Sequence, residues 1–81
     1  MSRARDVVEV VARALSNRPD AVRVTERAGR GQNVIELSMP QGDLGRVIGR
    51  QGRTAAAIRT LVALAAELDG TKATVDFKDE R

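Results

Sequence analysis

The chain begins with apolar residues at helical spacing. Val7, Val10, Val11, Ala14 and Leu15 recur three and four residues apart, which predicts an amphipathic helix that buries this stripe. Residues 16–20 are expected to end the helix, because a proline inside that segment cannot continue it.

Two segments with alternating apolar and polar residues come next. Val22 and Val24 share one side of residues 21–28, and residues 33–39 place Ile35, Leu37 and Met39 on one face. The glycine-containing turn at 29–32 joins the two segments, so they are predicted to pair as a hairpin. Pro40 and Gly42 should end the second strand.

Helical spacing returns in the second half of the chain. A short helix is predicted to begin near Asp43, and residues 49–52 interrupt it. A longer helix follows, whose predicted buried positions are Ile58, Leu61, Val62, Ala65 and Leu68. After a turn at 69–70, a last strand is predicted with Ala73, Val75 and Phe77 on its apolar face.

The predicted order of elements is therefore αββααβ. Each strand has only one apolar face, which is typical of a sheet covered by helices on one side and open to water on the other. We expect one α+β domain over residues 1–81, with a core at 3–78 and a charged tail at 79–81.

Composition removes several classes of function. The chain has no cysteine and no histidine, which excludes disulfides, thiolate and imidazole catalysis and ordinary zinc sites. With no convergent polar cluster either, we expect no enzyme, cofactor or metal. No apolar run approaches the ~20 residues that span a bilayer, and Asp6 and Glu9 interrupt any signal-peptide pattern. A cytoplasmic, non-membrane protein is the expectation.

Positive charge is concentrated in one segment. The net charge is only +3, but residues 44–66 contain four arginines and no acid, whereas the rest of the chain has ten basic and eleven acidic side chains. A localised basic patch indicates an anion site, and nucleic acid is the commonest large anion.

The glycines at the centre of this basic segment have two interpretations. Gly49 and Gly52 are either plain turn residues or the point where a nucleic-acid backbone approaches closely. In the second case, a phosphate faces the positive end of the following helix, with Arg50 and Arg53 beside it.

The stretch LGRVIGRQGRTAAAIRTL resembles the KH signature V-I-G-x-x-G-x-x-I. More narrowly, nearly the whole chain resembles the small bacterial single-KH RNA-binding proteins of the KhpA type. The resemblance implies a type II KH fold, with a three-stranded mixed sheet and three helices on one face. It also implies a groove for single-stranded RNA beside the G-x-x-G loop.

The resemblance implies a role for each residue of this region. Gly49 and Gly52 would admit the RNA backbone, Arg50 and Gln51 would point at phosphates, and Arg46 and Arg53 would flank the groove. Its apolar floor would come from Val47, Ile48, Ala56 and Ala57, unless these belong to the core. In the turn on the opposite wall, Arg30 is either an RNA contact or plain surface.

Phe77 is the lone aromatic residue and is expected in the core. The chain should therefore lack the aromatic stacking platform of other RNA-binding folds. Binding through backbone charge and groove shape predicts modest, salt-sensitive affinity with loose sequence preference.

The family also implies protein partners, either a second copy of the chain or a larger KH–R3H protein. It further implies the role of a post-transcriptional regulator or RNA chaperone. Two other classes stay open. One is a protein-interaction module whose glycines are structural. The other is a helix-turn-helix DNA binder, although its first helix would be very short and TAAAI is poor in side chains that read bases.

Overall fold

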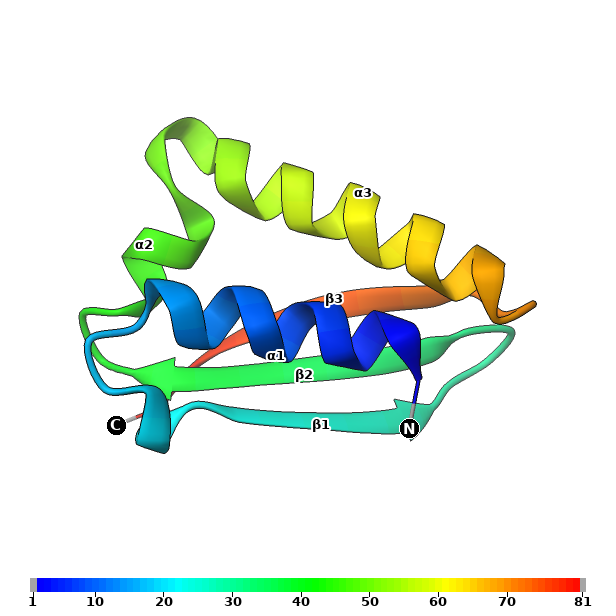
Figure 1. The fold of residues 1–81 in the computed structure, drawn as a ribbon, viewed down its shortest axis with the longest axis horizontal. Helices are drawn as coiled ribbons and strands as arrows, with labels where there is room; N and C mark the ends of the chain where they lie inside the picture. The colour runs from blue at the N-terminus through cyan, green and yellow to red at the C-terminus, as the bar shows by residue number, and fades with distance from the viewer. Residues whose placement is uncertain (1, 81) are drawn as a thin grey trace.

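Three strands form one mixed sheet. The computed structural model describes residues 2–80, with side chains for 2–78. Strands β1 (Arg23–Ala28), β2 (Asn33–Pro40) and β3 (Ala73–Glu80) lie in the order β1-β2-β3. β1 runs antiparallel to β2, and β3 runs parallel to β2 with Asn33 opposite Ala73. The central strand is therefore β2, and β3 forms one edge (Figure 1).

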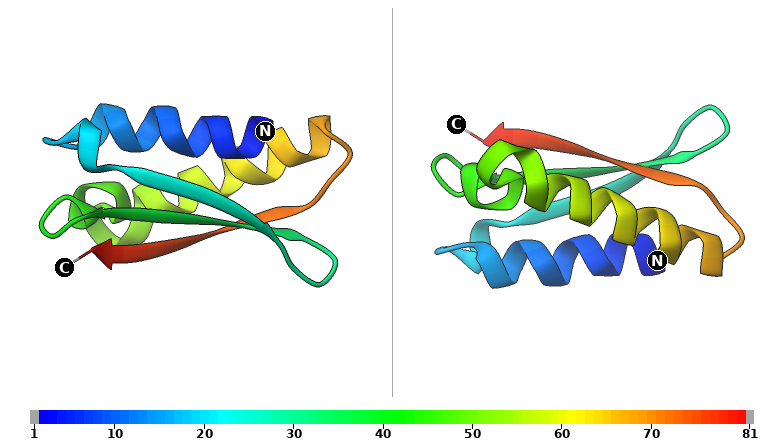
Figure 2. Two further views of the ribbon diagram at one scale, coloured as in Figure 1. Left: turned by 90° about the horizontal axis from the view of Figure 1, so that it is seen from below. Right: turned by 90° about the horizontal axis from the view of Figure 1, so that it is seen from above.

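The helices cover one face of this sheet. They are α1 (Arg3–Leu15), α2 (Leu44–Ile48) and α3 (Arg53–Leu68), with short 3-10 turns η1 (Pro19–Ala21) and η2 (Arg50–Gly52). Figure 2 shows the helices on one side and the sheet on the other. The two-layer α+β architecture, the order αββααβ and the mixed sheet expected of a type II KH fold are confirmed.

The core lies between these two layers, and its centre is β2. Ile35, Leu37 and Met39 point toward the helices and are completely buried, as their alternation predicted. The helices and β3 cover them with other fully or almost fully buried side chains: Val8, Val47, Val62 and Val75. Each such side chain contributes about 1.5–3 kcal/mol by leaving water, so this layer holds the helix pair α2–α3 in place.

Part of the predicted helical stripes is not buried. Val10 is 68% exposed, Leu61 47% and Leu68 73%, and Ala14 is also exposed, so their assignment to the core was wrong. α1 instead approaches the sheet through its small residues Ala4 and Ala12 on either side of Val8. Alanine lets the helix pack closely, which turns the valine stripe partly outward.

α1 and α3 lie side by side in opposite directions (Figure 1). The backbone N–H of Arg3 donates to Asp69 Oδ2 at 2.9 Å, which joins the start of α1 to the end of α3. β3 continues to Glu80, so the segment predicted as a tail is strand at 79 and 80, and Arg81 lies outside the described residues. None of the helices within residues 2–80 has the length and apolar character needed to cross a bilayer.

Candidate nucleic-acid interface

A sharp loop joins α2 to α3 and has an unusual backbone. Gly49 has φ 75° and ψ 175°, Gln51 has φ 57° and Gly52 has φ 72°. The conformation of Gly49 is one that essentially only glycine adopts. The left-handed conformation of Gln51 is uncommon for a residue with a side chain. The loop is therefore a specifically shaped turn within the segment VIGRQGR.

The two glycines of this loop do different work. A Cβ added at Gly49 would lie 2.8 Å from the Cβ of Thr54 and 3.1 Å from its backbone nitrogen, and would also press on Thr54 Oγ1. A Cβ added at Gly52 would meet nothing within 4 Å. Gly49 thus allows the loop to pack on α3, while the missing side chain at Gly52 keeps a space open at the first turn of α3.

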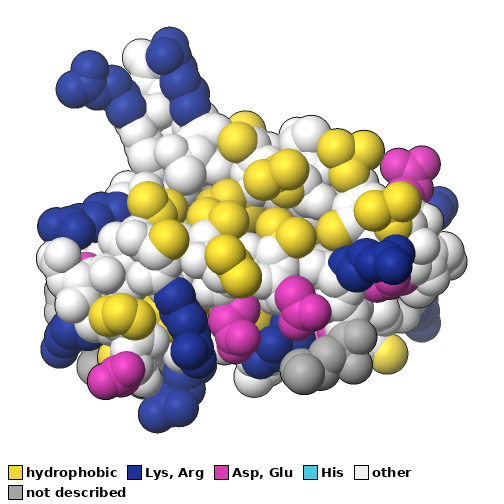
Figure 3. Space-filling view, viewed as in Figure 1, with side chains coloured by type: hydrophobic (Ala, Val, Ile, Leu, Met, Phe, Trp, Pro, Cys, Tyr) yellow, Lys and Arg dark blue, Asp and Glu magenta, His cyan; other side chains and the backbone are white. Residues whose placement is uncertain are grey.

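Positive charge surrounds that open space. α3 has 16 residues, and no side chain caps its N-terminus at Gly52, so the positive end of the helix dipole faces outward. Arg50 and Arg53 are exposed beside it, and Arg53 Nη2 donates to Gln51 Oε1 at 3.1 Å. Figure 3 shows Lys and Arg side chains standing clear of the molecule at this junction.

A buried carboxylate fixes the start of α2. Asp43 is only 6% exposed and accepts hydrogen bonds from Ser16 Oγ at 2.5 Å and from the backbone N–H of Asn17 at 3.2 Å. The pKa of Asp43 lies below its ordinary value, mainly because the hydroxyl of Ser16 donates a hydrogen bond to the carboxylate. Burial has the opposite effect on this pKa. The contact ties the end of α1 to the helix that precedes the loop.

Arg46 belongs to the same connection. Its Nη1 donates to Asn17 Oδ1 at 2.8 Å, so its guanidinium lies on the α1 side of α2 and not among the loop residues. Neither Asp43 nor Asn17 was singled out from the sequence as a site residue. Nothing in a local pattern distinguishes a buried aspartate before a helix from an exposed one.

Beyond the loop, α3 packs against the edge strand β3. Ala56, Arg59 and Ala63 follow one another along one side of α3, and the guanidinium carbon of Arg59 lies 5.0 Å from the ring centroid of Phe77 in β3. Arg59 therefore reaches from the helix to the strand.

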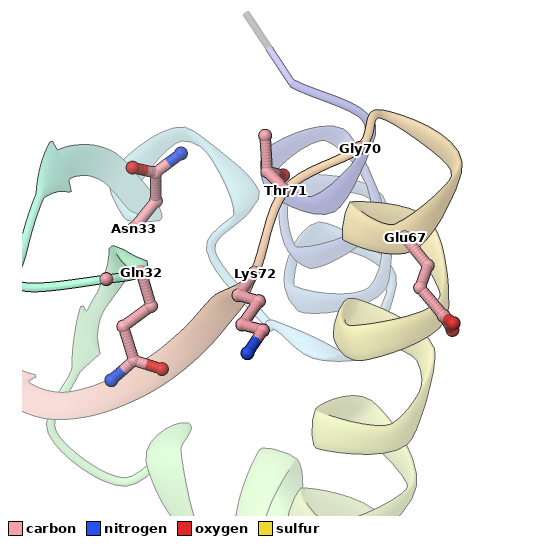
Figure 4. A pocket seen from close by; sticks show the side chains of 7 residues that line it. Gln32, Asn33, Glu67, Gly70, Thr71 and Lys72 are labelled. Carbon is pink, nitrogen blue, oxygen red and sulfur yellow. The ribbon is translucent and has the colours of Figure 1, made fainter.

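Farther along α3 from the loop, the surface contains a hollow. Its lining residues are Gln32, Ala63, Glu67, Thr71, Lys72 and Ala73. An adjoining hollow shares Gln32 and Lys72, which directly precede β2 and β3, and whose side chains point the same way in Figure 4. The sequence did not single out these two polar side chains as site residues, because the parallel pairing of β2 with β3 brings them together.

The structure brings together only part of the predicted site. Residues 49–53 form the loop and the first residue of α3, with Ile48 and Ala56 on either side in the sequence, and Ile48 is 37% exposed. Val47 is completely buried, so it belongs to the core and not to the floor of the groove. Ala57 is exposed on α3. Arg30 is exposed in the β1–β2 turn, at the opposite end of the molecule from the loop (Figure 1).

A helix pair joined by G-x-x-G and packed on a three-stranded mixed sheet is the arrangement of a KH domain. The family model described as "KhpA/KhpB, KH domain" matches residues 5–77. The chain therefore belongs to the KhpA/KhpB family of KH domains.

Similar proteins are named RNA-binding protein KhpA. The one from Caldanaerobacter subterraneus subsp. tengcongensis is 51% identical over 61 residues, covering 75% of this chain and 81% of that protein. Those from Halalkalibacterium halodurans and Clostridium perfringens are 43% and 40% identical, cover 93% and 90% of this chain, and are themselves covered over 99% and 97% of their length.

A solved structure shares the fold. The crystal structure of Era from Aquifex aeolicus, bound to GDP and AlF4−, matches with a TM-score of 0.61 at 17% identity. The match covers 94% of this chain and 29% of that one, so a fold of this kind is also found as part of a larger protein.

Proposed function

We propose that this protein binds single-stranded RNA, with the RNA backbone at residues 49–53 and the bases along the groove between α3 and β3. One observation carries the proposal: the open space at Gly52 lies at the uncapped start of α3, between two exposed arginines. The similarity to proteins named as RNA-binding supports the same ligand.

The chemistry of the loop favours a phosphate. Backbone N–H groups at the start of α3 and the guanidinium groups of Arg50 and Arg53 all favour negative charge. Replacing one of these arginines by a neutral residue should remove one phosphate contact. The slope of log K against log salt concentration should then become less steep by ~0.7 for a single strand. Such a contact positions RNA without choosing its sequence, which suits a cytoplasmic RNA chaperone or post-transcriptional regulator that acts by binding and not by catalysis.

A charge reversal at the loop tests this proposal. In the variant Arg50→Asp/Gln51→Asp, both glycines remain and two carboxylates face the proposed phosphate site. We expect affinity for single-stranded RNA to fall at least tenfold, equivalent to about 1.4 kcal/mol. Titration with a fluorescent RNA at fixed salt measures the change, and circular dichroism with a thermal melt checks the fold.

The matched control is Arg23→Asp/Gln41→Asp, at two exposed positions outside the loop and groove. Each double variant lowers the net charge from +3 to 0, since Arg→Asp removes two units and Gln→Asp one. The control should lose much less affinity than the loop variant. A folded loop variant that binds RNA as tightly as the parent would instead favour the interpretation in which the glycines only turn the chain.

We propose, second, that the protein associates with another KH protein, either a second copy of itself or a larger KH–R3H partner. The α1–α3 face carries four exposed large apolar side chains: Val10, Leu61, Leu64 and Leu68. Figure 3 shows hydrophobic side chains gathered along these two helices. Burying a contiguous apolar patch of this kind is the usual source of stability in an interface between subunits.

A further inference from the structure

Arg59 has an environment that the phosphate role of the loop does not explain. It lies six residues after Arg53 on α3, about 9 Å along the axis at 1.5 Å per residue. Its guanidinium is over the ring of Phe77, with 5.0 Å between guanidinium carbon and ring centroid. Phe77 is half-buried and packs against the core, whereas Arg59 is exposed.

This contact places a planar cation between α3 and β3, along the path proposed for the RNA. The attraction of a guanidinium to a π-face holds its flexible side chain against β3, so less conformational entropy is lost when a ligand arrives. Phe77 lies on one side of the guanidinium, and the exposed position of Arg59 leaves the other side open to a ligand. The faces of a guanidinium are weakly hydrated, so a planar ligand covers them at little cost.

We propose that Arg59, supported by Phe77, is a stacking platform for one nucleobase of the bound RNA. The inference rests on the proposed RNA-binding function and assigns the base-binding part of the same groove. RNA-binding proteins stack unpaired bases on aromatic rings or on arginine planes. Here the only aromatic ring of the chain supports the arginine from the core side, so the base stacks on the guanidinium.

This platform separates two contributions to binding. The loop attracts a phosphate by charge, and this contribution weakens with salt and does not depend on the base. The platform binds a base by stacking, and this contribution is lost if the base is missing, whatever the charge. Stacking tolerates every base because all four have a π-face, so the platform gives affinity with only weak sequence preference.

The variant Arg59→Lys tests the inference, because lysine keeps the charge and has no planar group. The probe is a short single-stranded oligouridine, together with the same RNA carrying one abasic residue at each position in turn. For the parent, one abasic position should weaken binding by about fivefold or more. For Arg59→Lys, binding of the intact RNA should fall by a similar factor, and the penalty at that abasic position should disappear.

Two further measurements exclude a purely structural or purely ionic role. Arg59→Lys should leave the salt slope of RNA binding unchanged, in contrast to Arg50→Ala, which removes a charge. The variant Phe77→Leu keeps an apolar side chain in the core but removes the ring under the guanidinium, so it should lower the abasic penalty at the same position. Thermal melts identify any variant whose fold is disturbed.

The outcomes separate this inference from the function on which it rests. A parent protein that does not bind oligouridine or a mixed-sequence RNA overturns the RNA-binding proposal itself. If the parent binds RNA, and Arg59→Lys binds it with the same affinity and the same abasic profile, the stacking platform alone is overturned. Loss of affinity in Arg59→Lys that is equal for intact and abasic RNA also overturns it.

Discussion

At the scale of single residues, the two glycines of the loop differ in whether the structure has room for a side chain. Gly49 combines a backbone conformation that is essentially restricted to glycine with a close approach to Thr54. Gly52 is left-handed but faces open space. The first glycine is thus required by the fold of the loop, and we propose that the second provides the room that a ligand needs.

Alanine substitutions should separate these two roles. Gly49→Ala should lower the free energy of unfolding by about 1–3 kcal/mol or more, because it adds backbone strain and a contact with Thr54 that requires movement. Gly52→Ala should cost about 1 kcal/mol, the strain of a left-handed residue alone. Urea unfolding measures both values. Equal destabilisation by the two substitutions would show that the close approach at Gly49 does not matter.

Gly52→Ala should also affect binding more than its small effect on stability suggests. Its new methyl group would project into the space where we propose the RNA backbone lies. Affinity for single-stranded RNA should fall severalfold in a protein that is still folded at the assay temperature. Unchanged affinity would place the RNA backbone elsewhere on the loop.

Asp43 gives the fold a dependence on acid pH. Its pKa is lowered in the folded protein, chiefly by the hydrogen bond from Ser16, so the ionised form stabilises the fold above the ordinary pKa of 3.8. This stabilisation is lost as the pH falls through the lowered value. Asp43→Asn should therefore melt below the parent at neutral pH, and the difference in Tm should shrink below about pH 3.8. A difference that persists undiminished at low pH would mean that the charge of Asp43 contributes nothing.

At the scale of elements, the open face of the sheet is joined by charges across all three strands. Glu36 on β2 accepts from Arg27 Nε of β1 at 2.9 Å and pairs with Lys78 Nζ of β3 at 3.2 Å. The hydrogen bond from Arg27 is the main cause that lowers the pKa of Glu36. Asp76 lies directly opposite Glu36 on β3, so two carboxylates face each other across the strands.

The two carboxylates should respond oppositely to neutralisation. Glu36→Gln removes both ion pairs and should lower the Tm, more at low salt than at 1 M salt, where exposed charges are screened. Asp76→Asn removes a like charge beside Glu36 and should leave the Tm unchanged or raise it. Differential scanning fluorimetry at two salt concentrations compares them. A lower Tm for Asp76→Asn would mean that it has its own stabilising partner.

The helical spacing of apolar residues predicted both long helices. It did not predict which residues of each apolar stripe are buried. A stripe defines a direction, whereas burial also depends on the width of the layer beneath it, which is why Val10 and Leu61 were wrongly assigned to the core. The G-x-x-G spacing located the loop, but it could not distinguish buried Val47 from its half-exposed neighbour Ile48. The position of Phe77 beside α3 depends on the pairing of β2 with β3, and no local sequence pattern predicts that pairing.

At the scale of the whole molecule, the large apolar residues that were wrongly assigned to the core lie on the two helices α1 and α3. Val10, Leu61 and Leu68 lie on the α1–α3 face, together with Leu64 at 54% exposure. Apolar periodicity is retained there although the domain itself does not cover the side chains. This is the pattern expected if a second KH protein covers them, as we propose.

Leu64→Glu tests this surface. The side chain is exposed, so the stability of the monomer should change by less than about 0.5 kcal/mol. If the face forms the interface of a homodimer, burial of a carboxylate should raise the dissociation constant at least tenfold. Sedimentation velocity over a wide concentration range measures it, with Gln41→Glu, at an exposed position outside α1 and α3, as the control with an equal change of charge.

Two results would contradict the homodimer. A parent that stays monomeric at high concentration would remove it and leave only a heterologous partner. A Leu64→Glu variant that dimerises as the parent does would move the interface to another face.

The parallel pairing of β2 with β3 has a consequence for the order in which the protein is made. Because parallel neighbours need a long crossover, the α2–α3 segment with its glycine loop is synthesised before the strand that forms the other wall of the groove. A nascent chain that has emerged only as far as the end of α3 carries the arginines of the loop but neither Lys72 nor Phe77. Such a chain has the proposed phosphate site but lacks the strand against which we propose that a base is held. If RNA binds as we propose, the ability to hold a base is acquired only after β3 is added.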